Sequence, residues 1–147
     1  MRARRGCGTV RLVIPGTPLA VRDALRRVFA APLLRGLDDD ARGTAELVLA
    51  EVLNNVVEHA YAGAPGEIDL RLGLLPDSLL CMVRDGGRPM PDERLPGGAL
   101  PVFAADDPPE GGFGWYMIRS LSQDLRYRRA GGRNHLRFRV ETRAAGA

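Results

Sequence analysis

Apolar residues recur with a period of two in several short runs of the chain. This spacing predicts β-strands, because successive side chains of a strand point to opposite faces of a sheet. Alternation is clear at residues 68–72, 125–129 and 136–140, whereas residues 10–14 and 79–83 are short, mostly apolar runs that also favour strands. Turn residues close or join them in chain order: Pro15-Gly16 ends the first, residues 76–78 join the second and third, and residues 130–134 join the last two. We therefore expect one N-terminal strand and two β-hairpins, each hairpin with one buried face.

Helical spacing of apolar residues predicts three helices between these strands. They span about residues 17–32, 38–61 and 113–122. Thr17 is a typical N-cap and Pro18 suits the first helical position, whereas the acidic residues 38–40 favour the N-terminus of the second helix. The order β-α-α-β-β-α-β-β predicts an α+β fold. It is a two-layer α/β sandwich with helices on one face of a mixed, mostly antiparallel sheet.

The chain has 147 residues, of which 45% are hydrophobic, and this size suits one domain over residues 1–147. We expect flexible ends at about residues 1–8 and 143–147. Residues 92–112 are rich in proline and glycine and show no periodicity. Segments of this kind in small domains are typical of functional lids or disorder, and we interpret this one as a lid.

Charge and cysteine content argue against several classes of function. The net charge is +3 and the pI is about 9.4, but all 21 basic residues are arginine and they are spread along the chain between acids. Such dispersion gives no groove-reading element, so direct nucleic-acid binding is disfavoured. Cys7 and Cys81 have no metal-ligand spacing, and no apolar run approaches the ~18 residues of a membrane span. We expect a cytoplasmic protein without a membrane segment.

The sequence EVLNNVVEHAY, residues 51–61, is the first of three motifs that carry chemistry. At 100° per residue, Glu51, Asn54, Asn55 and Glu58 share the polar side of the second helix, and Glu51 and Asn55 are neighbours one turn apart. Any amphipathic helix has a polar face, so this pattern alone is not decisive. Its functional interpretation is an amide oxygen for Mg²⁺ and a carboxylate that accepts a proton from a hydroxyl. His59, at the border of the two sides, is interpreted as a structural histidine.

Two glycine motifs complete the set. Asp85 ends a predicted strand and is followed by Gly86-Gly87, which favours an acceptor carboxylate beside backbone that a flat ligand such as adenine can approach. Gly111-Gly112 and Gly114 open the third helix, where free amides attract phosphate. Each motif alone is equally an ordinary turn or a hinge. In combination with Glu51 and Asn55 they predict a site for a metal-bound nucleotide.

The three motifs, in this order, resemble those of the GHKL ATPase superfamily, the Bergerat fold of gyrase, histidine kinases and anti-sigma serine kinases. The short chain and the form of the first motif are most similar to the anti-sigma serine kinases, over about residues 46–140. This resemblance implies ATP and Mg²⁺ as cofactors. It implies Glu51 as the general base, Asn55 as the Mg²⁺ ligand, Asp85 and Gly87 as adenine contacts, and Gly111, Gly112 and Gly114 as phosphate-binding glycines.

The chain departs from that family at two places. Pro89 occupies the last position of the usual Asp-x-Gly-x-Gly motif, where it fixes φ and removes an N–H donor. Relatives often carry a threonine near the adenine carboxylate, whereas this chain has Asn134 and His135, and we transfer no role to either residue.

The resemblance also implies an activity and partners. It points to transfer of the γ-phosphate to a serine or threonine of a STAS-type anti-sigma antagonist, with a sigma factor as the competing partner. The alternative is a nucleotide-binding anti-sigma adaptor with little or no kinase activity, which Pro89 motivates. A third interpretation is an interaction domain without a nucleotide site. The uncovered sheet face and the apolar residues of the lid are candidates for a homodimer contact or for a partner.

Overall fold

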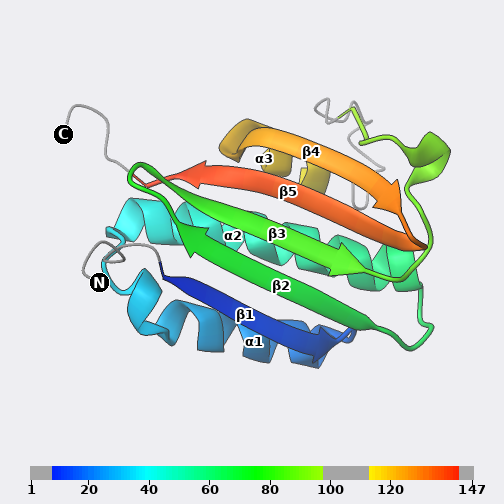
Figure 1. The fold of residues 1–147 in the computed structure, drawn as a ribbon, viewed down its shortest axis with the longest axis horizontal. Helices are drawn as coiled ribbons and strands as arrows, with labels where there is room; N and C mark the ends of the chain where they lie inside the picture. The colour runs from blue at the N-terminus through cyan, green and yellow to red at the C-terminus, as the bar shows by residue number, and fades with distance from the viewer. Residues whose placement is uncertain (1–7, 98–112, 143–147) are drawn as a thin grey trace, which may run out of the picture.

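The computed structural model describes residues 8–97 and 113–142. Its strands form one five-stranded antiparallel sheet in the order β1-β2-β3-β5-β4 (Figure 1). The elements are β1 (Thr9–Pro15), α1 (Pro18–Ala30), η2 (Pro32–Leu34), α2 (Asp39–Asn55), η3 (Val56–Tyr61), β2 (Glu67–Leu74), β3 (Ser78–Asp85), η4 (Pro91–Glu93), α3 (Phe113–Leu121), β4 (Gln123–Ala130) and β5 (Arg133–Glu141). The expected α+β class is confirmed, and every strand pairing in the described sheet is antiparallel.

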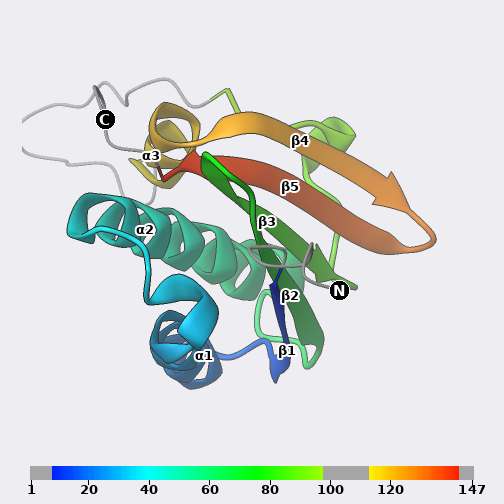
Figure 2. The same ribbon diagram turned by 60° about the vertical axis from the view of Figure 1, so that its left-hand side comes forward.

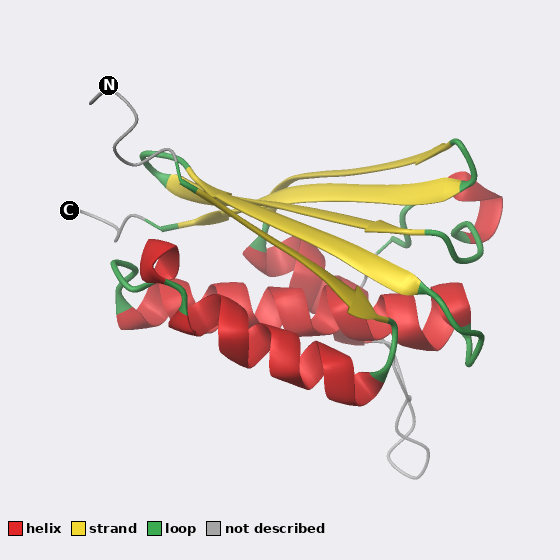
Figure 3. Ribbon diagram, turned by 60° about the horizontal axis from the view of Figure 1, so that its bottom comes forward, coloured by secondary structure: helices red, strands yellow, loops and turns green. Residues whose placement is uncertain are grey.

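The α-helices form one layer against one face of the sheet. α2 lies between α1 and α3 and packs against both (Figure 2). Figure 3 shows the helical layer on one side of the strands, while the opposite side of the sheet carries no α-helix of the described residues. The predicted two-layer sandwich is therefore observed. None of the described helices combines the length and the apolar character that crossing a membrane requires.

Both long helices begin where the sequence predicts. Thr17 Oγ1 accepts a hydrogen bond from the amide of Ala20 at 3.2 Å, with Pro18 in the first turn. Asp38 Oδ1 accepts one from the amide of Ala41 at 2.7 Å. Each cap satisfies an amide that has no partner inside the helix, which contributes about 1 kcal/mol. The caps fix where α1 and α2 enter the layer.

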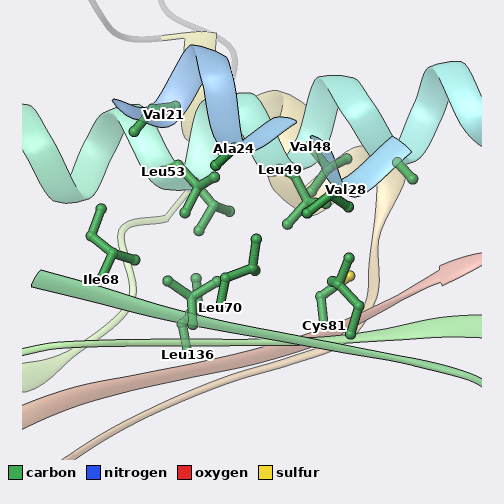
Figure 4. Close-up of a cluster of buried hydrophobic side chains, with 14 of the residues drawn as sticks. Val21, Ala24, Val28, Val48, Leu49, Leu53, Ile68, Leu70, Cys81 and Leu136 are labelled. Atoms are coloured by element: carbon green, nitrogen blue, oxygen red, sulfur yellow. The ribbon is translucent and has the colours of Figure 1, made fainter. Parts of the chain in front are cut away.

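The core lies between the sheet and the helical layer. Alternate residues of β2 are buried, including Ile68, Leu70 and Leu72, because only one face of the strand points toward the helices. Figure 4 shows side chains of α1 and α2 directed at those of the sheet. Burying each such side chain contributes about 1.5–3 kcal/mol. Packing in this core fixes the position of α2, and therefore of the first motif, relative to β3 and β5.

The end of the second helix differs from the sequence prediction in one respect. The chain stays helical to Tyr61, as expected, but after Asn55 it widens into the π-helical segment η3. The amide of Ala62 bonds to the carbonyl of Val57 at 3.1 Å, five residues earlier, and Ala62 then ends the helix with a left-handed φ of 50°. Apolar periodicity does not distinguish the two helix types over a single turn. π-helical turns of this kind are frequent at functional sites.

The turn of the last hairpin is shorter than predicted. Only Gly131 and Gly132 turn the chain, with φ of +60° and +72°, values that glycine adopts without strain. Arg133 and Asn134 were expected in the turn but belong to β5. Consequently, Asn134 is a buried strand residue that pairs with Asp85 of β3.

Candidate functional site

A cavity of about 500 Å³ lies beside the C-terminal part of α2 and η3, over the ends of β3 and β5. Asn55 lines it from α2, Asp85 from β3 and Asn134 from β5. Pro89 contributes to its wall from the loop after β3, and Trp115 from α3. Apolar residues such as Val52, Val83 and Leu136 make up much of the remaining surface. An apolar pocket with a few polar groups is the usual form of a small-molecule site.

Asp85 is the buried acid of this cavity, with only 6% of its surface exposed. Its Oδ1 accepts hydrogen bonds from the amide of Gly87 at 2.8 Å and from Nδ2 of Asn134 at 2.9 Å. Its Oδ2 accepts none from residues 8–97 and 113–142. Burial raises the pKa of Asp85, and the bonds from Asn134 and Gly87 partly oppose that effect. The carboxyl group is thus held by one oxygen while the other is left for a donor in the cavity.

Asn134 is the residue that connects the parts of this region. Its Nδ2 donates to Asp85 and to the carbonyl of Arg88, at 2.9 and 2.8 Å. Its Oδ1 accepts from the hydroxyl of Tyr127 at 2.6 Å and from Nη1 of Arg129 at 3.0 Å. The side-chain amide therefore has all four of its hydrogen-bond positions satisfied. No role was expected for Asn134 from the sequence, although its alternation with Leu136, Phe138 and Val140 is the signal that places it on the buried face of β5.

The loop after β3 lies against the end of η3. A Cβ atom at Gly87 would come within 2.5 Å of the carbonyl oxygen of Ala60, so only glycine allows this approach. The amide of Arg88 donates to that same carbonyl at 2.8 Å, and the amide of Met90 donates to the hydroxyl of Tyr127 at 3.1 Å. Pro89, which has no N–H, lies between these two anchored residues. Its substitution for glycine is accommodated locally without an unpaired donor.

Tyr61, the last residue of the first motif, fixes the start of the same loop. Its hydroxyl accepts from the amide of Gly86 at 2.9 Å and donates to the carbonyl of Glu67. The ring lies where a Cβ at Gly16 or Gly66 would be, within 2.7 and 2.1 Å respectively. Tyr61 thus joins η3 to both ends of the first hairpin, which explains why small residues surround it.

Glu51 and Asn55 meet α3 at Gly114. A Cβ built on Gly114 would be 2.9 Å from Oε2 of Glu51 and 3.8 Å from Nδ2 of Asn55. Nδ2 of Asn55 is buried and has no hydrogen-bond partner among the described residues. Because an amide can rotate to exchange its nitrogen and oxygen, this position can present either a donor or an acceptor. A buried polar atom without a partner is costly, so this nitrogen requires a partner from outside the described residues, such as a ligand, an ion or water.

The structure brings most of the predicted site residues together. Asn55 and Asp85 line one cavity, and Gly87 packs beside it. Gly114 contacts the Glu51–Asn55 turn, but Glu51 itself is not among the residues that line the cavity. Gly111 and Gly112 lie outside the described residues, as does most of the predicted lid.

The interpretation of His59 needs correction. Its side chain is 72% exposed, with Nε2 3.9 Å from Oε2 of Glu58, so it is not a structural residue of the core. The widening of the helix after Asn55 rotates this position toward solvent, and His59 instead lies at the edge of the cavity. Its carbonyl accepts a hydrogen bond from Arg88 at 3.0 Å.

The donors in this region fit a nucleotide better than a metal held by protein alone. Among the described residues, no group of three or more His, Cys, Asp or Glu side chains is arranged to bind a metal. Asn55 offers one amide, so a hard cation here would need further oxygen ligands from a bound phosphate or from water. The unpaired amide of Asn55 and the free oxygen of Asp85 lie on the same cavity, and each suits a different part of such a ligand.

Comparison with known proteins assigns the family. The model of the histidine kinase-like ATPase domain matches residues 14–140. The chain belongs to this family. The match includes all the strands and α-helices described above apart from the first residues of β1 and the last of β5.

Several relatives of this histidine kinase-like ATPase domain carry the name serine-protein kinase RsbW. The protein from Bacillus cereus strain AH187 is 32% identical over 83 residues, which is 54% of this chain and 52% of that protein. The one from Oceanobacillus iheyensis is 25% identical over 121 residues, covering 80% of this chain and 77% of that protein. The chain spans about half the length of the Bacillus relatives that it matches.

Solved structures of histidine kinase-like ATPase domains share the fold. The RsbU and RsbW domains of Rv1364c from Mycobacterium tuberculosis match with a TM-score of 0.58 at 18% identity, over 94% of this chain and 34% of that one. The blue-light activated histidine kinase EL346 of Erythrobacter litoralis gives 0.54 at 22% identity, over 83% of this chain and 39% of that one. At these identities the likeness concerns the fold.

Proposed function

We propose that this protein is an ATP- and Mg²⁺-dependent protein serine/threonine kinase of the anti-sigma type. Its substrate would be a STAS-type anti-sigma antagonist, and a sigma factor would be the competing partner. The observation that carries the proposal is the meeting of Glu51, Asn55 and Gly114 beside a cavity that contains Asp85. Relatives named serine-protein kinase support the direction of the transfer, from a nucleotide to a protein hydroxyl.

The adenine part of the ligand would lie at Asp85. The free Oδ2 accepts a hydrogen bond from an exocyclic amine, while Oδ1 stays bonded to Gly87 and Asn134. The close approach of Gly87 to Ala60 holds the loop backbone against the end of η3, which leaves room in the cavity for a flat ring. Apolar residues such as Val83 and Leu136 would contact the faces of that ring.

The phosphate end would lie toward Asn55 and the start of α3. A bound Mg²⁺ would supply charge neutralisation for the transferred phosphoryl group. Asn55 would hold the cation through its amide oxygen, and the first turn of α3 at Gly114 would present backbone amides to phosphate. Glu51, one turn before Asn55, would accept the proton of the incoming hydroxyl and position it. Most of the rate enhancement then comes from positioning these groups.

Phosphoryl transfer tests the proposal directly. The purified chain is incubated with radiolabelled ATP, Mg²⁺ and STAS-domain proteins of the same genome, and label on the STAS protein is measured. Glu51→Ala is expected to lower the labelling rate at least about 100-fold, the size of a general-base contribution. Glu46→Ala, an exposed acid on the same helix, is the matched control and should label normally. Undiminished labelling by Glu51→Ala would exclude Glu51 as the base.

Nucleotide binding is measured separately by thermal shift. ATP with Mg²⁺ should raise the melting temperature, since a ligand at about 100 times its Kd stabilises the native state by about 2.7 kcal/mol. Asn55→Ala is expected to lose the Mg²⁺-dependent part of this shift, whereas the neighbouring Asn54→Ala, exposed on the same helix, should keep it. A wild-type chain that binds ATP and a STAS protein without labelling it would establish the adaptor instead. No thermal shift with ATP would refute both functions.

A further inference from the structure

The uncovered face of the sheet gathers arginines that are far apart in the sequence. On this face the strand register places residues side by side in two adjacent rows. The first row is Arg11, Arg71, Met82, Arg137 and Arg126, and the second is Val13, Asp69, Arg84, His135 and Arg128. Their exposed or half-buried alternation with core residues confirms that both rows point away from the helices. Dispersed sequence positions thus become one basic surface.

This surface is hollowed rather than flat. A groove of about 870 Å³ runs over it, and five of the arginines in the two rows line the groove together with one carboxylate, Asp69. That carboxylate is already paired with arginines of β1, β2 and β3: Arg11 donates two hydrogen bonds to it, at 3.2 and 2.9 Å, and Arg71 and Arg84 lie within 3.4 and 3.8 Å. Arg11 lowers the pKa of Asp69 below its usual value, so the negative charge of Asp69 is paired with the arginines of these three strands.

The other half of the face has positive charge without a counter-charge. Within residues 8–97 and 113–142, no carboxylate forms an ion pair with Arg126, Arg128 or Arg137. Arg126 lies directly opposite Arg137 across the β4–β5 pair, and Arg128 follows two residues further along β4 on the same face. Like charges directly opposite one another destabilise a sheet. The native sheet retains this repulsion between arginines. An anionic ligand bound there would relieve it, so the surface is suited to such a ligand.

The neutral residues of the groove indicate which kind of anion fits. Met82 is 37% exposed at the centre of the first row, and Leu95 and Leu125 also line the groove. Two rings line the groove, Tyr127 and His135, and the hydroxyl of Tyr127 is bonded to Asn134, so the described residues form no row of aromatic side chains along it. Single-stranded nucleic acids bind through stacking on aromatic side chains, and duplexes need an element that enters a groove. Arginines around apolar side chains fit a protein segment in which acidic and apolar residues alternate.

We propose that the uncovered face of the sheet is a docking site for an acidic, apolar-containing segment of a partner protein, with Arg126, Arg128 and Arg137 as its main charge contacts. Arginine suits this role because its planar guanidinium pairs with a carboxylate through two hydrogen bonds. Met82 supplies the apolar contact between the two arginine groups. The site lies on the opposite side of the sheet from the cavity of Asp85, so docking there does not require nucleotide. The proposal therefore stands or falls independently of the kinase function.

Fluorescence anisotropy with a labelled peptide of alternating glutamate and leucine tests the proposal on the full chain. About eight residues are enough, since an extended peptide of that length crosses five strands about 4.8 Å apart. The triple variant Arg126→Gln, Arg128→Gln, Arg137→Gln is expected to weaken binding at least about tenfold, because each lost pair contributes modestly. The matched control, Arg22→Gln, Arg26→Gln, Arg27→Gln, removes the same charge from the exposed side of α1 and should bind normally.

A second variant guards against a loss of folding. Met82→Glu keeps every arginine but places a carboxylate between Arg71 and Arg137. It should therefore weaken binding of the acidic peptide, whereas the melting temperature of the protein should rise. Wild-type binding should fall steeply as salt rises to about 1 M, where the Debye length is about 3 Å. Equal binding by the triple variant and wild type would overturn the proposal. If a single-stranded DNA oligonucleotide bound more tightly than the peptide, the proposal would be overturned in favour of nucleic acid. If a peptide with glutamine in place of glutamate bound as tightly as the acidic one, the proposal would also be refuted.

Discussion

Nδ2 of Asn134 on β5 donates a hydrogen bond of 2.9 Å to Oδ1 of Asp85 at the end of β3. The two residues are direct cross-strand partners, and both are nearly inaccessible to solvent. The bond occupies one oxygen of the carboxyl group and orients the other toward the cavity. It also links the acid to Tyr127, Arg129 and the loop after β3, all of which bond to the same asparagine.

Replacement of Asp85 by asparagine should separate stability from ligand recognition. The new Oδ1 can accept the same bonds from Gly87 and Asn134, so the fold should remain. Because burial raises the pKa of Asp85, native protein keeps this proton at pH values where the unfolded chain has released it. The free energy of unfolding of the wild type therefore falls as pH rises from 3.8, the ordinary value, through the raised pKa.

Asp85→Asn lacks that titration, so the difference in unfolding free energy between variant and wild type should shift in favour of the variant over this range. Urea denaturation at a series of pH values measures it. Asp69→Asn provides the opposite sign as a control: the pKa of Asp69 is lowered, so its stabilisation is present above 3.8 and is lost as pH falls through the lowered pKa. Parallel pH curves for Asp85→Asn and wild type would contradict the prediction. ATP should no longer raise the melting temperature of Asp85→Asn at neutral pH.

Asn134→Ala should destabilise the protein by at least about 2 kcal/mol, because a buried polar group that loses its partner costs about 1–3 kcal/mol. The carboxyl group of Asp85, the hydroxyl of Tyr127 and the carbonyl of Arg88 each lose a bond. Chemical denaturation gives the free energy, and Arg133→Ala, the exposed neighbour in the same strand, is the control. A change no larger than that of the control would show that water replaces the amide at no cost.

Two glycine-to-alanine substitutions should have opposite effects on stability. Gly87→Ala puts a methyl group 2.5 Å from the backbone oxygen of Ala60, and overpacking of this kind costs about 1–3 kcal/mol. Gly43→Ala lies inside α2 with no atom within 4 Å of the added carbon, and it should gain up to about 1 kcal/mol through helix propensity. Thermal melts of both variants test the pair, and equal effects would refute the close approach at Gly87.

Gly114→Ala should impair phosphoryl transfer more than it affects folding. The added carbon would lie 2.9 Å from Oε2 of Glu51, a flexible side chain that can move aside. Moving that carboxylate by about 1 Å is enough to cost about 100-fold in rate, since catalysis here depends on positioning. Labelling of a STAS protein and the melting temperature are measured together, with Gly43→Ala as the control for an added methyl group. Normal labelling by Gly114→Ala would show that Glu51 needs no fixed position there.

Much of the architecture was predictable because it follows from local patterns. The alternation at Ile68, Leu70 and Leu72 identifies a half-buried strand, and Thr17 and Asp38 mark helix starts through bonds to amides three residues on. Such signals need only a few neighbouring residues. Local patterns do not predict the order of the strands in the sheet or the contact between α2 and α3. Those features could be inferred only from the three motifs together or from the structure.

The failures share a physical cause, which is sensitivity to a single residue of register. The predicted turn of five residues left Asn134 outside the strand, whereas the two-residue turn at Gly131 and Gly132 makes it a residue of β5 in phase with the buried Leu136. The wide π-helical turn after Asn55 likewise changed the direction of His59. The arginine surface was invisible for the same reason: Arg71 and Arg137 are brought near each other only by strand pairing, through Met82 between them.

The alternation of β3 has a consequence for how this protein can diversify. Val83 and Asp85 face the cavity, whereas Met82 and Arg84 face the groove on the reverse of the sheet. Neighbouring codons therefore specify opposite sides of the molecule. After a gene duplication, changes at the even-numbered positions of this strand can retune one surface while the odd-numbered positions stay under separate selection. A single strand would let paralogues diverge in what they recognise and keep a common interior.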